Sequence, residues 1–498
     1  MYDLLIIGGG INGAGIARDA AGRGLKVLLV EKDDLASHTS SASTKLIHGG
    51  LRYLEYYDFA LVRKALKERE VLLRAAPHII WPLRFVLPYH SGLRPAWLIR
   101  LGLFIYDHIG GRKLLPATKT LKRSKHDKLN PLTDNFSLAF EYSDCWVDDA
   151  RLVVLNAVDA ANHGADILTQ TECINLTRSN DFWTADLLTK DGANYQITSK
   201  AIINAAGPWV ETLASRADKT LGDKAKVRLV KGSHIIINKH FDGDHAFFFQ
   251  NADGRIIFAI PYENNNFTLI GTTDLSYDGD KDDVQISDEE IQYLCASANE
   301  YFKNKIDPND VVATYSGVRP LYDDKAADAS AVTRDYILSY DNDGGAPILS
   351  IFGGKITTYR KLAEDSLALF QDALLNIQKR EWTNGTPLPG GDIENADFDG
   401  FFKTLLEQYN WLDTTVLRRL ARCYGTQIHN ILQDVEGVND LGAHYGFGLY
   451  HKEVEYLQTH EFAKSVDDIL FRRTKLGLYF TDDQKNALEL ALSDLLHD

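Results

Sequence analysis

The sequence predicts a multidomain protein of mixed α/β and α+β class, and three observations support this prediction. The chain opens on a strand, helix and strand pattern around a glycine-rich turn within residues 2–30. Residues 227–272 alternate between polar and apolar side chains, as antiparallel strands do. Beyond residue 389, apolar residues recur at helical spacing. The 498 residues are also enough for two or three domains with separate cores.

The pattern at the start of the chain is a βαβ unit of the Rossmann-like kind. Two short apolar runs flank a helical segment, and Gly8, Gly10 and Gly13 between them satisfy G-x-G-x-x-G. These glycines allow a tight turn, a close approach of the backbone to a pyrophosphate, and close packing of the helix on its strand. Glu31 follows the second strand, where its carboxylate can accept hydrogen bonds from an adenosine ribose. The unit favours dinucleotide binding over a purely steric role for the glycines.

A hydroxyl-rich segment, residues 39–50, follows this unit and favours a flavin over a nicotinamide nucleotide. FAD has a long ribityl and pyrophosphate chain whose oxygens need hydroxyl and amide partners, whereas an NAD domain has no need of such a segment. We predict noncovalent FAD, because no Cys or His lies in a pattern that indicates covalent attachment. A polar surface loop is the alternative interpretation. The cofactor-binding residues expected here are Ser40, Ser41, Ser43, Thr44, Lys45, His48 and Gly49.

Two later segments are expected to complete the cofactor site. Residues 201–209 form an apolar strand that ends in a small-residue turn, and residues 348–352 form a second short strand followed by a glycine pair, a lysine and a helix. A helix N-terminus and a lysine aimed at one place would stabilise negative charge that develops on a flavin during its reduction. An ordinary strand-to-helix turn is the alternative for the glycine pair. The residues expected to contact the cofactor are Ala206, Gly207, Gly353, Gly354, Lys355 and Thr357.

Composition excludes several other functions. The formal net charge of −15 argues against nonspecific nucleic-acid binding, which needs a surplus of Lys and Arg. The four cysteines are too irregularly spaced for a disulfide framework or a metal site, so a reducing cytoplasm is expected and no metal is predicted. We expect no signal peptide, because the sequence opens on a strand-like run at residues 2–7. The most apolar later segment, residues 96–109, is too short to span a bilayer.

Many motifs together give a specific resemblance. In order along the chain they are GGGINGAG, SSASTKLIHGGLRYLE, NAAGPW, KGSH, GTTD, SGVRPL, TRDY and GGKITTYR. The chain resembles the aerobic, FAD-dependent glycerol-3-phosphate dehydrogenase family of the D-amino-acid-oxidase-like flavoproteins. The resemblance implies oxidation of sn-glycerol 3-phosphate to dihydroxyacetone phosphate by hydride transfer to flavin N5, with electrons passed to a membrane quinone. Related glycerol-3-phosphate oxidases, which use oxygen, are typically longer, so the length favours a dehydrogenase.

The resemblance also implies a Rossmann-like FAD-binding domain that is interleaved with an antiparallel β-sheet substrate domain. We expect residues 1–79, 145–225 and 335–386 to form the FAD-binding domain, and residues 80–144 and 226–334 to form the substrate and membrane-facing domain. Residues 388–498 should form a C-terminal helical cap domain. The strands expected in the substrate sheet are 227–238, 246–250, 255–261 and 267–272, and the clearest C-terminal helices are 401–409, 415–424 and 485–496.

The substrate site needs a phosphate clamp, and the family places arginines there. Arg319 and Arg334 are the candidates, because guanidinium groups bind phosphate oxygens bidentately. A structural ion pair with Asp335 is the alternative role for Arg334. The full substrate-binding set implied by the resemblance is Arg52, Tyr53, His234, Thr272, Arg319 and Arg334.

Catalysis needs a base that accepts the C2 hydroxyl proton as hydride leaves. The family places His234 beside the substrate, and a histidine has a suitable pKa. His48 is the competing choice, and arginine-assisted deprotonation is a third. A lone His in an apolar strand is also commonly a core residue. The expected catalytic residues are His234, Arg319 and Lys355.

A basic and apolar segment, residues 84–128, predicts attachment to the inner face of the cell membrane. It holds ten Lys or Arg residues and two acidic ones, and residues 96–109 add apolar and aromatic side chains. A solvated basic face or a contact in a homodimer is the alternative. Other functions left open are a glycerol-3-phosphate oxidase that uses oxygen, an amine or amino-acid oxidase of the same fold, and a non-catalytic flavin-binding scaffold.

Overall fold

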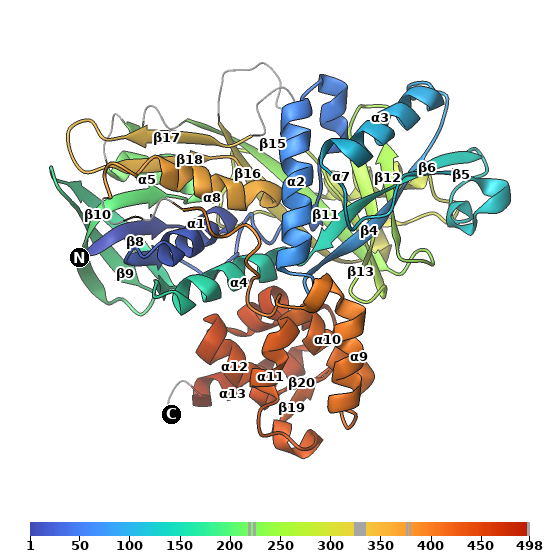
Figure 1. Ribbon diagram of the computed structural model, residues 1–498. Coiled ribbons are helices and arrows are strands. Elements are labelled where there is room, and N and C mark those ends of the chain that lie inside the picture. The colour runs from blue at the N-terminus through green and yellow to red at the C-terminus, as the bar shows by residue number, and fades with distance from the viewer. Residues whose placement is uncertain (218–220, 223–225, 323–334, 375–376, 378–379, 496–498) are drawn as a thin grey trace.

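The protein is described by a computed structural model that covers residues 1–217, 221–222, 226–322, 335–374, 377 and 380–495. Two large sheets stand side by side, and a helical domain lies beneath both (Figure 1). Helix α2 (Phe59–Ala75) stands at the boundary between the two sheets. The mixed α/β and α+β multidomain class that the sequence predicts is confirmed.

The first sheet has the order β17-β18-β10-β1-β2-β7 and carries the amino-terminal βαβ unit. Strands β1, β2, β7, β10 and β18 run parallel, and the apolar runs of β1, β2, β18 and the end of β10 are buried because helices cover the sheet. The strands are β1 (Tyr2–Ile7), β2 (Val27–Val30), β7 (Asp166–Leu168), β8 (Thr171–Arg178), β9 (Trp183–Thr189), β10 (Asn194–Asn204), β17 (Ile337–Asp341) and β18 (Ile348–Phe352). The accompanying helices are α1 (Ile11–Gly22), α4 (Asp149–Asn162), α5 (Val210–Ala217) and α8 (Tyr359–Ala368).

The second sheet has the order β15-β11-β14-β13-β12-β4-β6-β3, with β16 paired to β11 and β5 paired to β6. Its neighbours are antiparallel except for β4 and β12. Its strands are β3 (Leu46–Ile47), β4 (Ile80–Pro88), β5 (Lys119–Lys122), β6 (Leu138–Val147), β11 (Val227–Asn238), β12 (His245–Gln250), β13 (Ile256–Tyr262), β14 (Phe267–Gly271), β15 (Leu275–Ser276) and β16 (Val311–Tyr322). Helices α3 (Ala96–Ile109) and α7 (Asp288–Asn299) flank it. Strand β3 belongs to this sheet although the sequence expectation assigned residues 1–79 to the FAD-binding domain.

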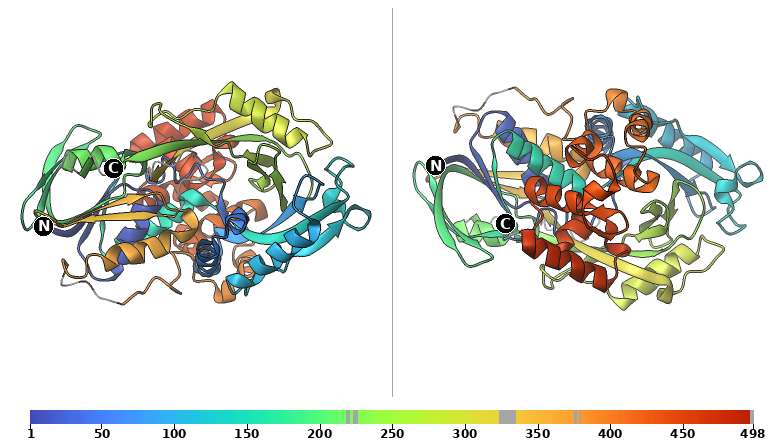
Figure 2. Two further views of the ribbon diagram at one scale, coloured as in Figure 1. Left: turned by 90° about the horizontal axis from the view of Figure 1, so that it is seen from above. Right: turned by 90° about the horizontal axis from the view of Figure 1, so that it is seen from below.

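The C-terminal domain has a hydrophobic core of its own. Its helices are α9 (Phe398–Gln408), α10 (Thr414–Tyr424), α11 (Ile428–Ile431), α12 (His451–Glu461) and α13 (Asp482–Leu495). The domain also contains a π-helix (Asp468–Arg473) and a short hairpin of β19 (His444–Gly446) and β20 (Leu449–Tyr450), which the helical pattern did not predict. Seen from below, it lies across the boundary of the two sheets (Figure 2).

Buried ion pairs attach the C-terminal domain to the segments around the βαβ unit. Arg473 donates two hydrogen bonds of 2.7 Å to Asp34, three residues after Glu31. Lys475 lies 3.5 Å from Asp149 at the start of α4. These contacts fix the loop after β2 and the start of α4 relative to the C-terminal domain.

Candidate active site

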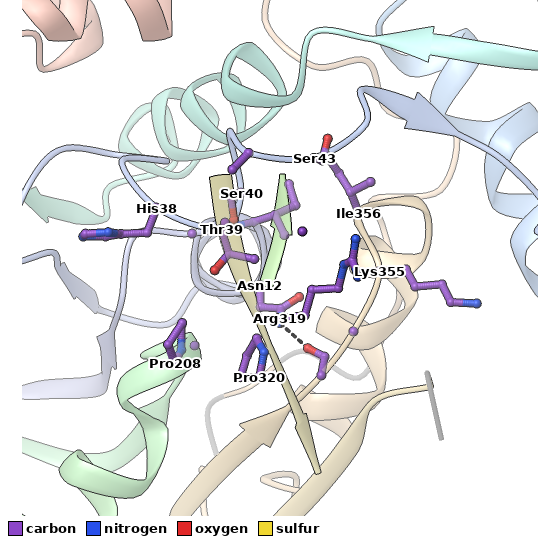
Figure 3. Close-up of a pocket in the computed structure, with 18 of the residues that line it drawn as sticks. Asn12, His38, Thr39, Ser40, Ser43, Pro208, Arg319, Pro320, Lys355 and Ile356 are labelled. Atoms are coloured by element: carbon purple, nitrogen blue, oxygen red, sulfur yellow. Dashed lines mark hydrogen bonds between the residues drawn. The ribbon is translucent and has the colours of Figure 1, made fainter. Parts of the chain in front are cut away.

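A cavity of about 480 Å³ runs between the two sheets. It extends from the βαβ unit and the turn after β10, past the hydroxyl-rich segment, to aromatic residues of the second sheet. In Figure 3, His38 and Pro208 lie at one end of the drawn site and Lys355 and Ile356 at the other, with Asn12 between them. Segments far apart in the sequence therefore meet around one elongated space.

The glycine-rich turn forms one wall of this cavity. Gly8 has a φ of +115°, and a Cβ atom on it would lie 2.4 Å from the carbonyl oxygen of Ala205. A Cβ atom on Gly13 would lie 1.9 Å from the carbonyl oxygen of Gly8, so α1 packs on β1 through the backbone. Gly8 and Gly10 line the cavity, whereas Gly13 supports the turn from behind. The N-terminus of α1 thus faces the space, as anion binding requires.

Glu31 lies beside this turn and lines the cavity. Its carboxylate accepts hydrogen bonds from the backbone N–H groups of Gly9 at 2.6 Å and Asp33 at 2.9 Å. Burial raises the pKa of Glu31 above the usual value, against the effect of these two bonds. The carboxylate is held in place by the backbone and has further lone pairs for ribose hydroxyls.

The hydroxyl-rich segment divides into residues that face the cavity and residues that support them. Ser40, Ser43 and Thr44 line the space, and the Ser40 hydroxyl also accepts from the N–H of Ile11 at 3.0 Å. Lys45 is buried and donates to Asp149 at 2.9 Å and to the Ser41 carbonyl at 3.0 Å. Lys45 and Ser41 do not line the cavity, so they hold the segment and are not placed to touch a ligand.

The far end of the cavity carries the glycine pair after β18. Gly353 and Gly354 have φ values of +68° and +98°, and both line the cavity with Lys355. The Lys355 ammonium lies 3.8 Å from the ring centroid of Tyr53. Gly49 and Thr357 lie outside the cavity lining: the Gly49 N–H donates to the Tyr106 hydroxyl at 2.8 Å, and the Thr357 hydroxyl accepts from the His48 N–H at 3.2 Å.

Unpartnered polar atoms indicate that the cavity is built for a polar ligand. The side-chain oxygen of Asn12 and the hydroxyl of Ser37 are buried and have no hydrogen-bond partner within the described parts of the chain. Both residues line the cavity, and the Asn12 amide donates to the Gly353 carbonyl at 3.2 Å (Figure 3). Buried polar groups without partners are costly, so a ligand that supplies donors here would be stabilised. Ala206 and Gly207 also line the cavity.

Four of the six expected substrate-binding residues line the cavity, and His234 does not. Arg52, Tyr53, Thr272 and Arg319 all line it. Arg319 donates to Asp274 at 3.0 Å, which fixes its guanidinium at the strand edge. Arg334, the second arginine of the expected phosphate clamp, lies outside the described residues.

The two candidate histidines occupy different positions. His48 lines the cavity, and burial together with the charges of Lys355 and Arg69 lowers its pKa to about 4. His234 is 1% exposed, does not line the cavity, and contacts the Thr44 hydroxyl at 3.0 Å through Nε2. Burial and nearby positive charge lower the pKa of His234 well below its usual value. His48 therefore faces the cavity, whereas His234 lies behind Thr44.

Comparisons with known proteins assign the chain to a family. Residues 3–360 match the FAD dependent oxidoreductase family, and residues 382–495 match the C-terminal domain of alpha-glycerophosphate oxidase. The glycerol-3-phosphate dehydrogenase of Pseudomonas aeruginosa is 51% identical over 98% of this chain and 94% of its own length. The chain belongs to the FAD-dependent glycerol-3-phosphate dehydrogenase family. The predicted resemblance and the predicted cofactor, FAD, are confirmed.

Two further members of the comparison bear on cofactor and substrate. The D-erythritol 1-phosphate dehydrogenase of Brucella abortus is also 51% identical, over 97% of this chain and 96% of its own length. Among solved structures, a glycerol-3-phosphate dehydrogenase from Bacillus halodurans in complex with FAD superposes with a TM-score of 0.75 at 27% identity, covering 99% of this chain and 95% of that one. The similarity to this FAD-bound structure thus covers nearly the whole chain.

Several residues of this FAD-dependent enzyme's cavity were not expected from the sequence. An aromatic wall from the second sheet lines it, made of Phe85, Tyr142, Phe248 and Phe258. Asp144 and Arg255 also line it. Asp144 is buried and binds Arg69 at 2.6 Å, and Arg255 follows the turn between β12 and β13. Alternating strand patterns place such residues on a sheet face, but they do not tell which face meets the other domain.

Proposed function

We propose that the chain oxidises sn-glycerol 3-phosphate to dihydroxyacetone phosphate and passes the electrons to a membrane quinone. The observation that carries this proposal is that Arg52, Arg319, Lys355 and His48 line the same cavity as the glycine-rich turn and Glu31, which suit a dinucleotide. A dianionic phosphate ester needs such a cluster of cations, whereas a neutral amine or an amino acid does not.

The substrate class supported by the relatives is broader than one compound. One relative of 51% identity is named for glycerol 3-phosphate and another of equal identity for D-erythritol 1-phosphate. Both are polyol phosphates, and identity alone does not separate them. We therefore propose oxidation of D-erythritol 1-phosphate as the second candidate function.

The chain's own residues have separate roles in this proposal. Bound FAD supplies the acceptor for the hydride that leaves the reacting carbon. The cations of Arg52, Arg319 and Lys355 attract the phosphate ester and orient it by charge-assisted hydrogen bonds. The neutral imidazole of His48 accepts the proton of the reacting hydroxyl, because its lowered pKa keeps it unprotonated at neutral pH. The aromatic wall limits the access of water to this end of the cavity.

Anaerobic mixing of the FAD-loaded protein with each polyol phosphate tests the proposal. We expect rapid loss of the oxidised flavin absorbance with glycerol 3-phosphate and little change with unphosphorylated glycerol. Faster reduction by D-erythritol 1-phosphate would favour the second candidate. A flavin that stays oxidised with both phosphates would contradict the proposed activity and favour a scaffold role.

Substitution of the two histidines should separate their roles. His48→Asn should slow flavin reduction by roughly 100-fold at neutral pH while FAD stays bound, because the direct proton acceptor is lost. His234→Asn should have a smaller effect, since Thr44 lies between it and the cavity. In the unsubstituted protein, the reduction rate should stay level from neutral pH downward and fall as the pH approaches 4, where the His48 imidazole becomes protonated and can no longer accept a proton. Stopped-flow absorbance at several pH values measures the rate of flavin reduction in all three proteins. A larger loss of rate in His234→Asn than in His48→Asn would indicate that His234 is the base.

The membrane-facing surface is proposed to centre on α3. Trp97, Leu101 and Phe104 are 69%, 46% and 51% exposed and recur at the spacing of one helix face, while Leu103 and Tyr106 on the other face are buried. An exposed apolar stripe of this kind on a helix beside basic residues favours the interface of a bilayer. None of the helices within the described ranges is long and apolar enough to cross a membrane.

Not all of the ten Lys and Arg residues in the segment 84–128 are available to bind lipid. Arg84 donates to Glu141 at 2.8 Å and is mostly buried, and Arg123 donates to the Thr133 and Leu132 carbonyls at 2.6 and 3.0 Å. Both are held by internal acceptors, so they do not present a free basic face to lipid. The basic residues of this segment that are exposed include Lys113, Lys119, Lys122 and Lys125.

Neutralising Lys119, Lys122 and Lys125 to glutamine together should weaken binding to anionic vesicles at least tenfold, because each cation near such a surface contributes about 1 kcal/mol. Flavin reduction by soluble substrate should be unchanged. The matched control changes Lys403, Lys452 and Lys485 to glutamine, which alters the net charge equally but in the C-terminal domain, away from α3 and β5 (Figure 1). Vesicle co-sedimentation measures the difference, and equal binding by both variants would count against this surface.

A further inference from the structure

An arginine that no motif marked lies at the rim of the active-site cavity. Arg255 follows the turn between β12 and β13, and it lines the same cavity as Arg52. A Cβ atom built on the neighbouring Gly254 would lie 4.0 Å from Nη2 of Arg52. The guanidinium of Arg52 therefore lies against the tip of the β12–β13 hairpin, although the two elements are some two hundred residues apart in the sequence.

The position of the Arg255 side chain is fixed from one side. Its Nε donates to Asp253 at 2.8 Å, and its guanidinium lies 3.8 Å from the ring centroid of Tyr293 on α7. Asp253 also accepts from the Arg255 backbone N–H and from the Tyr293 hydroxyl, both at 2.9 Å. The aspartate is thus held by the hairpin and by α7, and the arginine has little rotamer freedom left to lose on binding.

The two terminal nitrogens of Arg255 have no hydrogen-bond partner among the residues that the structure describes. The guanidinium of Arg52 likewise has no hydrogen-bond partner within the described residues, and it lies 5.9 Å from the ring centroid of Tyr56. A guanidinium fork without partners, held in place by its Nε, matches the oxygens of a phosphate group bidentately. Arg52 supplies a second guanidinium at the same rim, and two guanidinium groups together favour a doubly charged anion between them.

We propose that Arg255 is a substrate-binding residue that, with Arg52, holds the phosphate group of the polyol phosphate at the rim of the cavity. The inference rests on the proposed function, since it presumes a phosphorylated substrate. It adds to that function the direction of the substrate: the phosphate lies outward between η1 (Leu51–Tyr56) and the β12–β13 hairpin, and the reacting hydroxyl lies inward near His48. Asp253 and Tyr293 act through Arg255 as positioning residues.

Steady-state and stopped-flow kinetics of the FAD-loaded protein test this proposal. Arg255→Ala should raise the KM for glycerol 3-phosphate tenfold to about 100-fold with kcat at saturation nearly unchanged, because ground-state and transition-state binding of the phosphate are lost together. The slow reaction with unphosphorylated glycerol should not change. The KM of Arg255→Lys for glycerol 3-phosphate should lie between those of the unsubstituted protein and Arg255→Ala, because lysine keeps the charge but cannot form the bidentate hydrogen bonds of a guanidinium. Lys239→Ala is the control, because it removes one cation of the same domain, paired with Asp242 on the surface, outside the cavity.

Inorganic phosphate supplies a second readout that does not depend on turnover. Titration of the holoenzyme with phosphate, followed by the flavin absorbance, should give an apparent Kd at least tenfold weaker in Arg255→Ala than in the unsubstituted protein. Unchanged KM and unchanged phosphate affinity in both Arg255 variants would overturn the proposal. If neither polyol phosphate reduces the flavin of the unsubstituted protein, the proposed function fails, whereas the phosphate titration still decides whether Arg255 binds the anion.

Discussion

Gly13→Ala should yield protein that purifies without bound FAD. A Cβ atom at this position would lie 1.9 Å from the carbonyl oxygen of Gly8, far inside van der Waals contact with backbone that cannot rotate away. To relieve the contact, α1 must move off β1, and its N-terminus and the turn at Gly8 move with it. Because pyrophosphate binding depends on this turn, we expect the FAD content to fall below one tenth of that of the unsubstituted protein. The flavin absorbance relative to the protein absorbance after purification measures it.

Gly102→Ala is the matched control for this experiment. The chemical change is the same, the position is also helical, and a Cβ atom there would meet nothing within 4 Å in the described structure. Full FAD content in Gly102→Ala and loss in Gly13→Ala would locate the effect at the turn. Normal loading of Gly13→Ala, with an affinity for FAD like that of the unsubstituted protein, would contradict the role of this glycine.

The segments that the sequence predicted best are those with one dominant local signal. The expected strand at residues 348–352 has the same bounds in the structure, and the two apolar runs expected within residues 2–30 form β1 and β2. Parallel strands buried on both faces have uninterrupted apolar runs, and glycines or charges end those runs sharply. The amphipathic C-terminal helices were found for the same reason, to within a few residues at either end.

Pairing between distant segments could not be predicted from such local signals. Strand β1 pairs with β10 some two hundred residues later, and β4 pairs in parallel with β12. The sequence of one strand does not identify the strand that it pairs with, because side-chain alternation fixes only which face is buried. The resemblance to a known family supplied the interleaving of domains that local patterns lack.

The same limit explains the differences within the site. Lys45 lies among residues that face the cavity, yet its ammonium is buried against Asp149, more than one hundred residues later in the chain. Arg255 follows an Asp-Gly turn that reads as an ordinary hairpin, and only the approach of Arg52 from η1 makes this turn part of a cavity. Sequence patterns gave the residue types that FAD and a phosphate need, and the long-range packing decides which of them face the ligand.

The attachment of the C-terminal domain offers the second large effect. Arg151 on α4 is fully buried, donates to Glu461 at the end of α12 at 2.9 Å through Nη2, and donates to the Cys423 carbonyl at 2.8 Å. Arg151 also donates to this carboxylate through Nη1, and no other residue in the part of the chain that the structure describes donates a hydrogen bond to it. Removal of the arginine therefore leaves an uncompensated carboxylate in the interior, at the interface between the FAD-binding segments and the C-terminal domain.

Arg151→Met should lower the free energy of unfolding by about 3–5 kcal/mol, the usual cost of leaving one partner of a buried ion pair unpaired. The double variant Arg151→Met, Glu461→Met should recover more than half of this loss, because it removes the stranded charge, although the Cys423 carbonyl stays without its donor. As a control, Lys239→Met breaks an exposed pair with Asp242 and should cost at most about 1 kcal/mol. Chemical denaturation followed by tryptophan fluorescence and by flavin release measures all three. If the double variant were less stable than Arg151→Met, the ion pair would not be the source of the loss, and packing of the arginine stem against Tyr424, whose ring centroid lies 5.0 Å from the guanidinium, would replace it as the cause.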